Sequence, residues 1–241
     1  MVYSMNQVVP SYLCDRADRL QPWAAVRLCQ EVTEYHGNSV GGGFETLVAQ
    51  NRAWVIVRSY YEFRCRPAAF GHIAMDTWSR GNDGLFAFRD YRVTGADGST
   101  LLTGTSYWTL IDYAQRRAVR LHDHVGIYDI VDEKATCRER LERLAMPKME
   151  QPDLEYGLQA RHSMIDHTGH VNNSEYIKWI FDALEQCGFD ADRPFSLELN
   201  FQHETKPGDT ARIAVKKQDQ DFYALVTNSS GTSVTARISE L

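Results

Sequence analysis

The stretch Asp166-His167-Thr168-Gly169-His170-Val171-Asn172-Asn173 places several polar side chains and a glycine immediately before a helical pattern. In that pattern, which runs from Ser174 to Cys187, apolar residues recur at the spacing of one helix face. Asn172, Asn173 and Ser174 are all residue types that cap helices. The first N–H groups of a helix lack intrahelical partners and carry partial positive charge. The sequence therefore predicts a polar turn, at the start of a helix, that is suited to binding an oxygen.

Two groups of segments alternate between apolar and polar residues and are rich in β-branched and aromatic side chains. Such alternation is typical of antiparallel strands. The pair Asp97-Gly98 also indicates a hairpin turn. The predicted strands are 54–57, 60–63, 72–78, 86–93 and 101–111 in the first half, and 196–201, 210–216, 222–228 and 233–239 in the second.

The order of strand, polar turn and helix also occurs twice. A first strand is predicted within 8–18, and Pro22, a favoured first helical residue, opens a pattern that ends at Gly37. Residues 62–67 align with 200–205, which indicates an internal duplication with a period near 138 residues. The expected organisation is an N-terminal domain at 1–122, a linker at 123–153 and a C-terminal domain at 154–241.

The linker is predicted to contain a short helix. Asp132 can cap a helix that runs through Leu144, and Pro147 and Pro152 follow it. Arginines and glutamates are interleaved on this segment, so it is either a solvated helix or a docking site for a partner. The arginines are Arg138, Arg140 and Arg143.

Composition argues against several classes of protein. The net charge of −6 disfavours broad nucleic-acid binding. The longest uninterrupted apolar run, Ala53 to Val57, is too short for a membrane span, and no secretion signal precedes Ser11, so we expect a cytoplasmic protein. The five cysteines are odd in number, lie far apart and form no C-x-x-C pair. We therefore expect no disulfide framework, no zinc site and no other cofactor.

The polar turn resembles the active-site turn of hotdog-fold thioesterases, and most of all that of the acyl-acyl carrier protein (acyl-ACP) thioesterases of bacteria and plant plastids. The family pattern is Asp-x-Asn-x-His-x-x-Asn, followed by Tyr and Trp on the helix. The resemblance covers about residues 10–241, and Thr168 stands where the family has Asn. The matching residues are Asp166, His170, Asn173, Tyr176 and Trp179.

The resemblance implies an α+β double hotdog fold, in which two units each wrap an antiparallel sheet around a long helix. Such a chain is a pseudo-dimer and can be a monomer or a homodimer. The implied substrate is an acyl chain linked to the phosphopantetheine of acyl carrier protein, in fatty acid biosynthesis. The first half would hold the acyl chain, and Trp23, Val26, Val32 and the loop 41–51 are candidate walls.

Hydrolysis of a thioester needs a base to activate water and donors to stabilise the oxyanion. By resemblance, Glu204 occupies the place of a catalytic Glu, and Thr205 follows it where plant relatives have Cys, which excludes a papain-like thiol mechanism. We expect Glu204 or Asp166 to activate water, His170 to polarise the substrate or shuttle a proton, and Thr168 to orient a neighbour. Direct attack by Asp166 remains an alternative. The helix-start N–H groups around 171–173, with His170, are candidate oxyanion donors.

The first copy reads Asp18-Arg19-Leu20-Gln21-Pro22 at its turn and has Arg66 opposite Glu204, so only the second copy is expected to react. The remaining histidines are expected to be structural or surface residues, since none has a partner at metal-binding spacing. They are His36, His72, His122, His124, His162, His167 and His203.

Three alternative functions fit the same motif less well. One is hydrolysis of acyl-coenzyme A, and another is a non-catalytic protein that binds acyl thioesters on the same fold. A dehydratase of hydroxyacyl thioesters is the third, and such enzymes lack the Asp-x-x-x-His-x-x-Asn turn. Comparing thiol release from acyl-ACP and from acyl-coenzyme A distinguishes these functions.

Overall fold

A computed structural model describes residues 1–121 and 128–241. The first half contains β1 (Tyr3–Val8), η1 (Ser11–Leu13), α1 (Pro22–Ser39), α2 (Phe44–Ala49), β2 (Arg52–Phe63), β3 (His72–Asn82), β4 (Ala87–Gly95), β5 (Thr100–Asp112) and β6 (Arg117–Ala118). The second half contains β7 (Leu154–Gln159), η3 (His162–Met164), α3 (Asn173–Gln186), β8 (Phe195–Phe201), β9 (Thr210–Gln218), β10 (Asp221–Asn228) and β11 (Gly231–Glu240).

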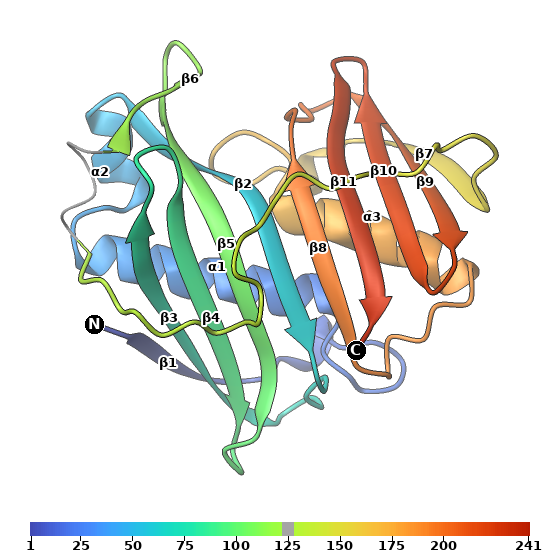
Figure 1. Cartoon of the computed structure of the whole chain (residues 1–241), viewed down its shortest axis with the longest axis horizontal. Helices are drawn as coiled ribbons and strands as arrows, with labels where there is room; N and C mark the ends of the chain where they lie inside the picture. Colours follow the sequence, from blue (N-terminus) through green and yellow to red (C-terminus); the bar gives the residue numbers. More distant parts are fainter. Residues whose placement is uncertain (122–127) are drawn as a thin grey trace.

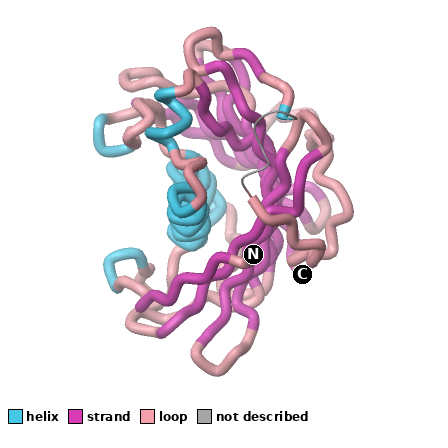
Figure 2. Tube along the Cα trace, turned by 90° about the vertical axis from the view of Figure 1, so that its left-hand side faces the viewer, coloured by secondary structure: helices cyan, strands magenta, loops and turns pink. Residues whose placement is uncertain are grey.

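All the described strands belong to one antiparallel sheet in the order β1-β3-β4-β5-β2-β8-β11-β10-β9-β7, with β6 paired to β5. The halves join where β2 pairs with β8, from Arg58 opposite Asn200 to Phe63 opposite Phe195. Figure 2 shows the helices on one side of the curved sheet, and α1 contacts α3. The expected α+β double hotdog is therefore confirmed (Figure 1).

Local sequence explains where the two long helices begin. α1 has Pro22 at its first turn, where a missing N–H costs no hydrogen bond. α3 is capped by Asn172, whose side chain accepts from the N–H of Ser174 at 2.9 Å. Apolar residues of both helices pack into one core that spans the halves, and the α3 residues Ile177, Ile180 and Leu184 are fully buried. Burying such a side chain contributes about 1.5–3 kcal/mol, so packing holds the turn before α3 in place.

Two of the predicted strand positions differ from the structure. The first strand is Tyr3–Val8, a partly buried edge strand, and only Val8 falls in the predicted range because residues 11–21 form a turn instead. Segments 54–57 and 60–63 belong to the single strand β2, which is interrupted by a bulge between Ile56 and Arg58. The hairpin at Asp97-Gly98 is present, and Gly98 there has a φ of +81°.

The predicted linker helix at 132–144 is wrong. This segment has no helical turn and crosses the face of the sheet opposite the helices (Figure 1). Sheet side chains bond its backbone: Trp78 Nε1 donates to the carbonyl of Glu133, and Asn200 Oδ1 accepts from the N–H of Leu144. Backbone groups that are bonded to side chains of the sheet cannot form the hydrogen bonds of a helix, so the segment takes an extended path.

The linker arginines therefore do not form a helical docking face. Arg138 lies over the ring of Tyr60 at 4.8 Å and pairs with Glu198 at 3.6 Å. Arg143 donates to Gln202. No helix within the described ranges is long and apolar enough to span a membrane.

Candidate active site

The Asp166 carboxylate organises the turn before α3. Its Oδ1 accepts from the N–H of Thr168 at 2.9 Å and from the Thr168 hydroxyl at 2.5 Å, and its Oδ2 accepts from Asn172 Nδ2 at 3.2 Å. Gly169 completes the turn with a φ of +85°, a backbone conformation that glycine adopts without strain. Both carboxylate oxygens are therefore engaged in holding the turn.

His170 and Glu204 come together from two different elements. His170 ends the turn before α3, and Glu204 follows β8; their Nε2 and Oε2 atoms are 3.0 Å apart. Two hydrogen bonds hold the backbone next to these side chains: the N–H of Val171 donates to the Thr205 carbonyl, and the N–H of Thr205 donates to the Tyr176 hydroxyl at 3.0 Å. The segment after β8 is thus bonded both to the turn and to α3.

Arg116 is a third member of this cluster, and the sequence analysis missed it. It lies in the turn between β5 and β6, in the first half, at a φ of +55°. Its Nη1 is 3.3 Å from Glu204 Oε1, and its Nη2 is 2.8 Å from His170 Nε2. Nothing in the local sequence distinguishes it from a surface arginine, because only the fold carries it across to the second half.

The proton on His170 decides which of these contacts forms. A protonated Nε2 donates to Glu204, whereas an unprotonated Nε2 accepts from Arg116. One nitrogen cannot do both at once. A proton at Nε2 therefore gives the hydrogen bond to Glu204, and its absence gives the hydrogen bond from Arg116.

Two of the three backbone N–H groups predicted as oxyanion donors are already bonded. The N–H of Val171 donates to Thr205, and the N–H of Asn172 donates to the carbonyl of Met164 at 3.0 Å. These bonds build the turn, so the prediction is wrong for both groups. Within the described ranges, the N–H of Asn173 has no acceptor, which leaves it and His170 as candidates.

A cavity of about 410 Å³ adjoins this cluster. Asp166, Thr168, His170 and Glu204 all line it, together with residues from α1, β2, β4 and β5 of the first half. This size is in the range of small-molecule sites. Of its lining residues, which all belong to the described chain, none is a cysteine. The four predicted site residues are thus brought to one cavity, although Asp166 bonds Thr168 and Asn172 rather than the His170 ring.

The predicted walls of the acyl site are only partly correct. Trp23, Val26 and Val32 belong to the buried core instead, and none of them lines the cavity. From the loop 41–51, Phe44 does line the cavity, and its ring packs edge-on against His167 with centroids 4.7 Å apart. His167 and His203 also line the cavity, although we expected structural or surface roles for both.

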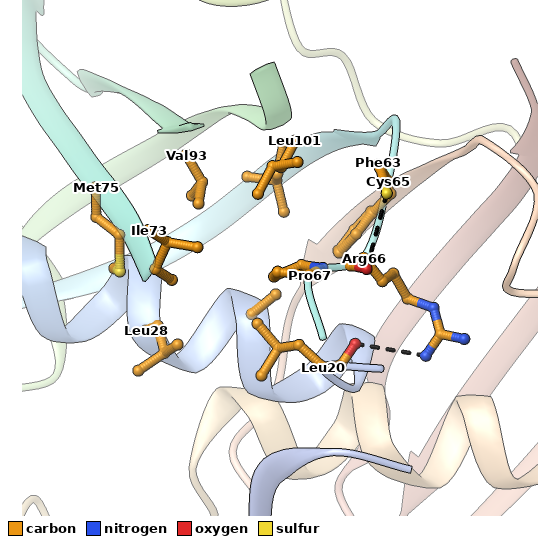
Figure 3. A pocket seen from close by; sticks show the side chains of 12 residues that line it. Leu20, Leu28, Phe63, Cys65, Arg66, Pro67, Ile73, Met75, Val93 and Leu101 are labelled. Carbon is orange, nitrogen blue, oxygen red and sulfur yellow. Dashed lines mark hydrogen bonds between the residues drawn. The ribbon is translucent and has the colours of Figure 1, made fainter. Parts of the chain in front are cut away.

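A second hollow, between α1 and the sheet of the first half, is too small for a substrate. Figure 3 shows its apolar lining, which includes Leu28, Ile73, Met75 and Val93. Its volume is about 10 Å³, which accommodates at most one water molecule. The hollow is therefore a packing defect of the core rather than a binding site.

The first half contains a counterpart of the turn, offset from the residues that we aligned. Asp15, rather than Asp18, corresponds to Asp166: its Oδ1 accepts from the N–H groups of Ala17 and Arg19 at 2.9 and 3.1 Å. The turn thus repeats after 151 residues, from Asp15 to Asp166, whereas the sheets repeat after 138, because α1 is longer than α3 and α2 follows it. The first copy therefore retains the aspartate of the motif.

Known proteins resemble this chain along most of its length. The Acyl-ACP thioesterase N-terminal domain matches residues 1–128, and the Acyl-ACP thioesterase C-terminal domain matches residues 148–240. Oleoyl-acyl carrier protein thioesterase 2 of Arabidopsis thaliana is 25% identical over 232 residues, covering 87% of this chain. The chain spans 62% of the length of that relative.

Solved structures show the same fold. The 12:0-ACP thioesterase from Umbellularia californica superposes with a TM-score of 0.88 at 21% identity, covering 99% of this chain and 96% of that one. An acyl-ACP thioesterase from Bacteroides thetaiotaomicron superposes with a TM-score of 0.83 at 23% identity, covering 98% and 96% of the two chains. With matches to both domains of the family across nearly the whole sequence, the chain belongs to the acyl-ACP thioesterase family.

Proposed function

We propose that the protein hydrolyses acyl-ACP to a free fatty acid and the thiol of the carrier. The observation that carries this proposal is the pairing of His170 with Glu204 at 3.0 Å beside a cavity that extends into the first half. The family and the named relatives support the same reaction. In this proposal the phosphopantetheine arm of acyl carrier protein delivers the thioester to the cluster.

In the proposed mechanism, Glu204 is the base. It takes a proton from water while the water oxygen attacks the thioester carbon, and the carbonyl oxygen becomes an oxyanion. His170 and the N–H of Asn173 are the proposed donors to that oxygen, and one well-placed donor contributes roughly 3–4 kcal/mol. The C–S bond then breaks, and the thiolate takes up a proton. Since a thiol has a reference pKa near 8.5, its departure needs little help from an acid.

Glu204 suits the role of base better than Asp166 does. Both oxygens of Asp166 accept hydrogen bonds from the turn, so proton uptake or direct attack there would break those bonds. The Glu204 side chain is 42% exposed, and within the described residues its carboxylate pairs with His170 and Arg116 alone. We therefore assign Asp166 and Thr168 to positioning, and Arg116 to orienting the Glu204 carboxylate.

Thiol release from purified protein tests the proposal. We expect faster release from acyl-ACP than from acyl-coenzyme A, and we expect Glu204→Gln to lower kcat by at least about a hundredfold, the usual effect of losing a general base. Glu142→Gln, which removes an exposed carboxylate from the linker, is the matched control. Wild-type turnover by Glu204→Gln would contradict the assignment of the base, and acyl binding without thiol release would instead indicate a non-catalytic binding protein. The cytoplasmic location and the monomeric or homodimeric state stay predictions.

A further inference from the structure

The cavity wall opposite the active-site turn has an apolar part, to which Trp54, Ile56 and Trp108 belong, and a polar part. The polar part consists of Gln30, Thr33 and Glu34 of α1, Arg89 of β4 and Tyr128. A saturated chain gains free energy by leaving water for apolar surroundings, and it offers no acceptor to a buried donor. The polar part of the wall therefore favours a chain that carries a polar group.

Arg89 is the most informative of these residues. Arg89 is only 7% exposed, and within residues 1–121 and 128–241 it forms no salt bridge with a carboxylate. Its Nη1 contacts His36 Nδ1 at 3.0 Å and donates to the Thr77 hydroxyl at 3.2 Å, and its guanidinium lies 5.0 Å from the ring centre of Tyr128. An arginine has five N–H donors, and both of these contacts use a single nitrogen.

The partners of Arg89 do not neutralise its charge. Burial, and next the positive charge of Arg89, lower the pKa of His36 to about 4, so this imidazole is neutral at physiological pH and accepts the hydrogen bond. Thr77 and Tyr128 are neutral as well. A buried guanidinium whose partners within residues 1–121 and 128–241 are all neutral is stabilised by a further acceptor.

Gln30 supplies a second donor in the same wall. Its Nε2 is buried and has no hydrogen-bond partner among the described residues. The neighbouring Thr33 hydroxyl, by contrast, is already bonded to the carbonyl of Cys29 and to the Tyr91 hydroxyl. Gln30 is set apart from the other buried unpaired groups by lining the cavity, where an acceptor on a ligand can satisfy its Nε2.

We propose that the cavity accepts acyl chains that carry an oxygen substituent, a hydroxyl or keto group, which accepts hydrogen bonds from Gln30 and Arg89. This inference rests on the proposed thioesterase function and names its substrate class. A second carboxylate on the chain is disfavoured, because Glu34 lines the same wall and its Oε1 is held there by the N–H of Phe44. A neutral oxygen satisfies both donors without adding a like charge.

Hydrolysis of matched chains tests the inference. Dodecanoyl-ACP is compared with dodecanoyl-ACP that carries a hydroxyl at the third, sixth or terminal carbon, or a keto group at the third. We expect kcat/KM to be at least about tenfold higher for one of the oxygenated chains, as for a hydrogen bond to a charged donor. A wild-type preference for the plain chain over all four oxygenated chains, or equal rates for all five, would overturn the proposal.

Two variants connect the preference to the wall. Gln30→Leu and Arg89→Met are each expected to reduce the ratio of oxygenated to plain kcat/KM severalfold, whereas Arg16→Met, which removes an arginine whose side chain is 92% exposed, should keep the wild-type ratio. If Arg89→Met does not fold, Gln30→Leu decides, because its amide nitrogen has no partner to lose among the described residues. An unchanged ratio in Gln30→Leu would remove that residue from the proposal.

Binding separates this inference from the thioesterase function itself. The S-dodecyl and S-hydroxydodecyl thioethers of pantetheine cannot be hydrolysed, so calorimetry measures only their fit to the cavity. Tighter binding of a hydroxylated thioether supports the inference even if no acyl-ACP is cleaved, an outcome that would refute the proposed function alone. Hydrolysis of the plain chain, together with equal binding of the thioethers, would refute the inference alone.

Discussion

The turns at 11–22 and 162–173 have the same backbone plan. Each begins with one turn of 3-10 helix, continues through an isolated antiparallel bridge and runs into the long helix of its half. The bridges join Cys14 to Leu20 and Ile165 to Val171. In both turns an aspartate, Asp15 or Asp166, accepts the N–H found two residues later. The aspartate therefore belongs to the architecture that the two halves share.

The difference between the turns lies in the residues around that aspartate. Where the second turn has His170 and Glu204, the first has Arg19 and Arg66. Arg66 is 7% exposed; it pairs with Asp15 at 2.5 Å and with Asp192, and it donates to the carbonyl of Ala191. This ion-pair cluster fills the first site, whereas the corresponding place in the second half opens on the cavity. One backbone plan thus supports a closed cluster of ion pairs in one half and an open polar cluster in the other.

Removing His170 should have the largest effect on this comparison. We expect His170→Ala to lower kcat by at least about a hundredfold, because a general acid-base group contributes about that much. Its counterpart Arg19 is an exposed residue outside the cavity, so Arg19→Ala should leave kcat within about twofold, since a surface substitution changes little. Steady-state thiol release measures both. A comparable loss of kcat in Arg19→Ala would show that the turn of the first half also contributes to catalysis.

Asp166→Asn tests whether the shared aspartate is only architectural. The amide keeps one acceptor for Thr168 but loses the bond from Asn172, so we expect kcat to fall about tenfold, which corresponds to roughly 1.4 kcal/mol. Asp15→Asn is the matched change in the first turn, and thermal unfolding of both variants reports the structural cost. A loss beyond about a thousandfold in Asp166→Asn would assign this carboxylate to the chemistry, as expected for a nucleophile.

The smallest predicted effect is a pH dependence of stability that arises from the first turn. Burial favours a higher pKa for Asp15, but hydrogen bonds from Arg66 and the backbone outweigh it and hold the pKa below its ordinary value of 3.8. A lowered carboxyl pKa adds stability that is fully present above the unfolded pKa and is lost as pH falls through the folded pKa. We therefore expect Asp15→Asn to lose less stability than wild type in urea titrations as pH drops below 3.8. Identical acid sensitivity would contradict this.

Local patterns predicted most of the fold because their causes are local. Alternating burial located β5 at 101–111, where the structure has Thr100–Asp112, and β10 at 222–228, where it has Asp221–Asn228. The start of α3 was predicted within one residue because Asn172 caps the helix through its own side chain. Capping and amphipathic spacing act over a few residues and can be read directly from sequence.

Contacts between distant segments explain the predictions that were wrong. The linker has helical composition, yet side chains of Trp78, Asp90 and Asn200 bond its backbone in an extended path. The N–H groups of Val171 and Asn172 are bonded to Thr205 and Met164, so the turn uses donors that we expected to be available to substrate. Apart from Met164, which lies in the same turn as Asn172, these partners are too far away in sequence to produce a recognisable pattern.

The amino-acid sequence by itself determined the repeated unit and the polar turn before α3, because periodicity and short motifs carry that information. The resemblance to a family singled out Asp166, Thr168, His170 and Glu204, which the fold brings to one cavity. Only the tertiary structure decided that Arg116 reaches His170 and Glu204 from the other half, and that Arg89 is buried in the cavity wall. The physical reason is that burial and charge pairing depend on which strands become neighbours. An arginine has the same local signature whether the fold leaves it in water or encloses it beside a substrate.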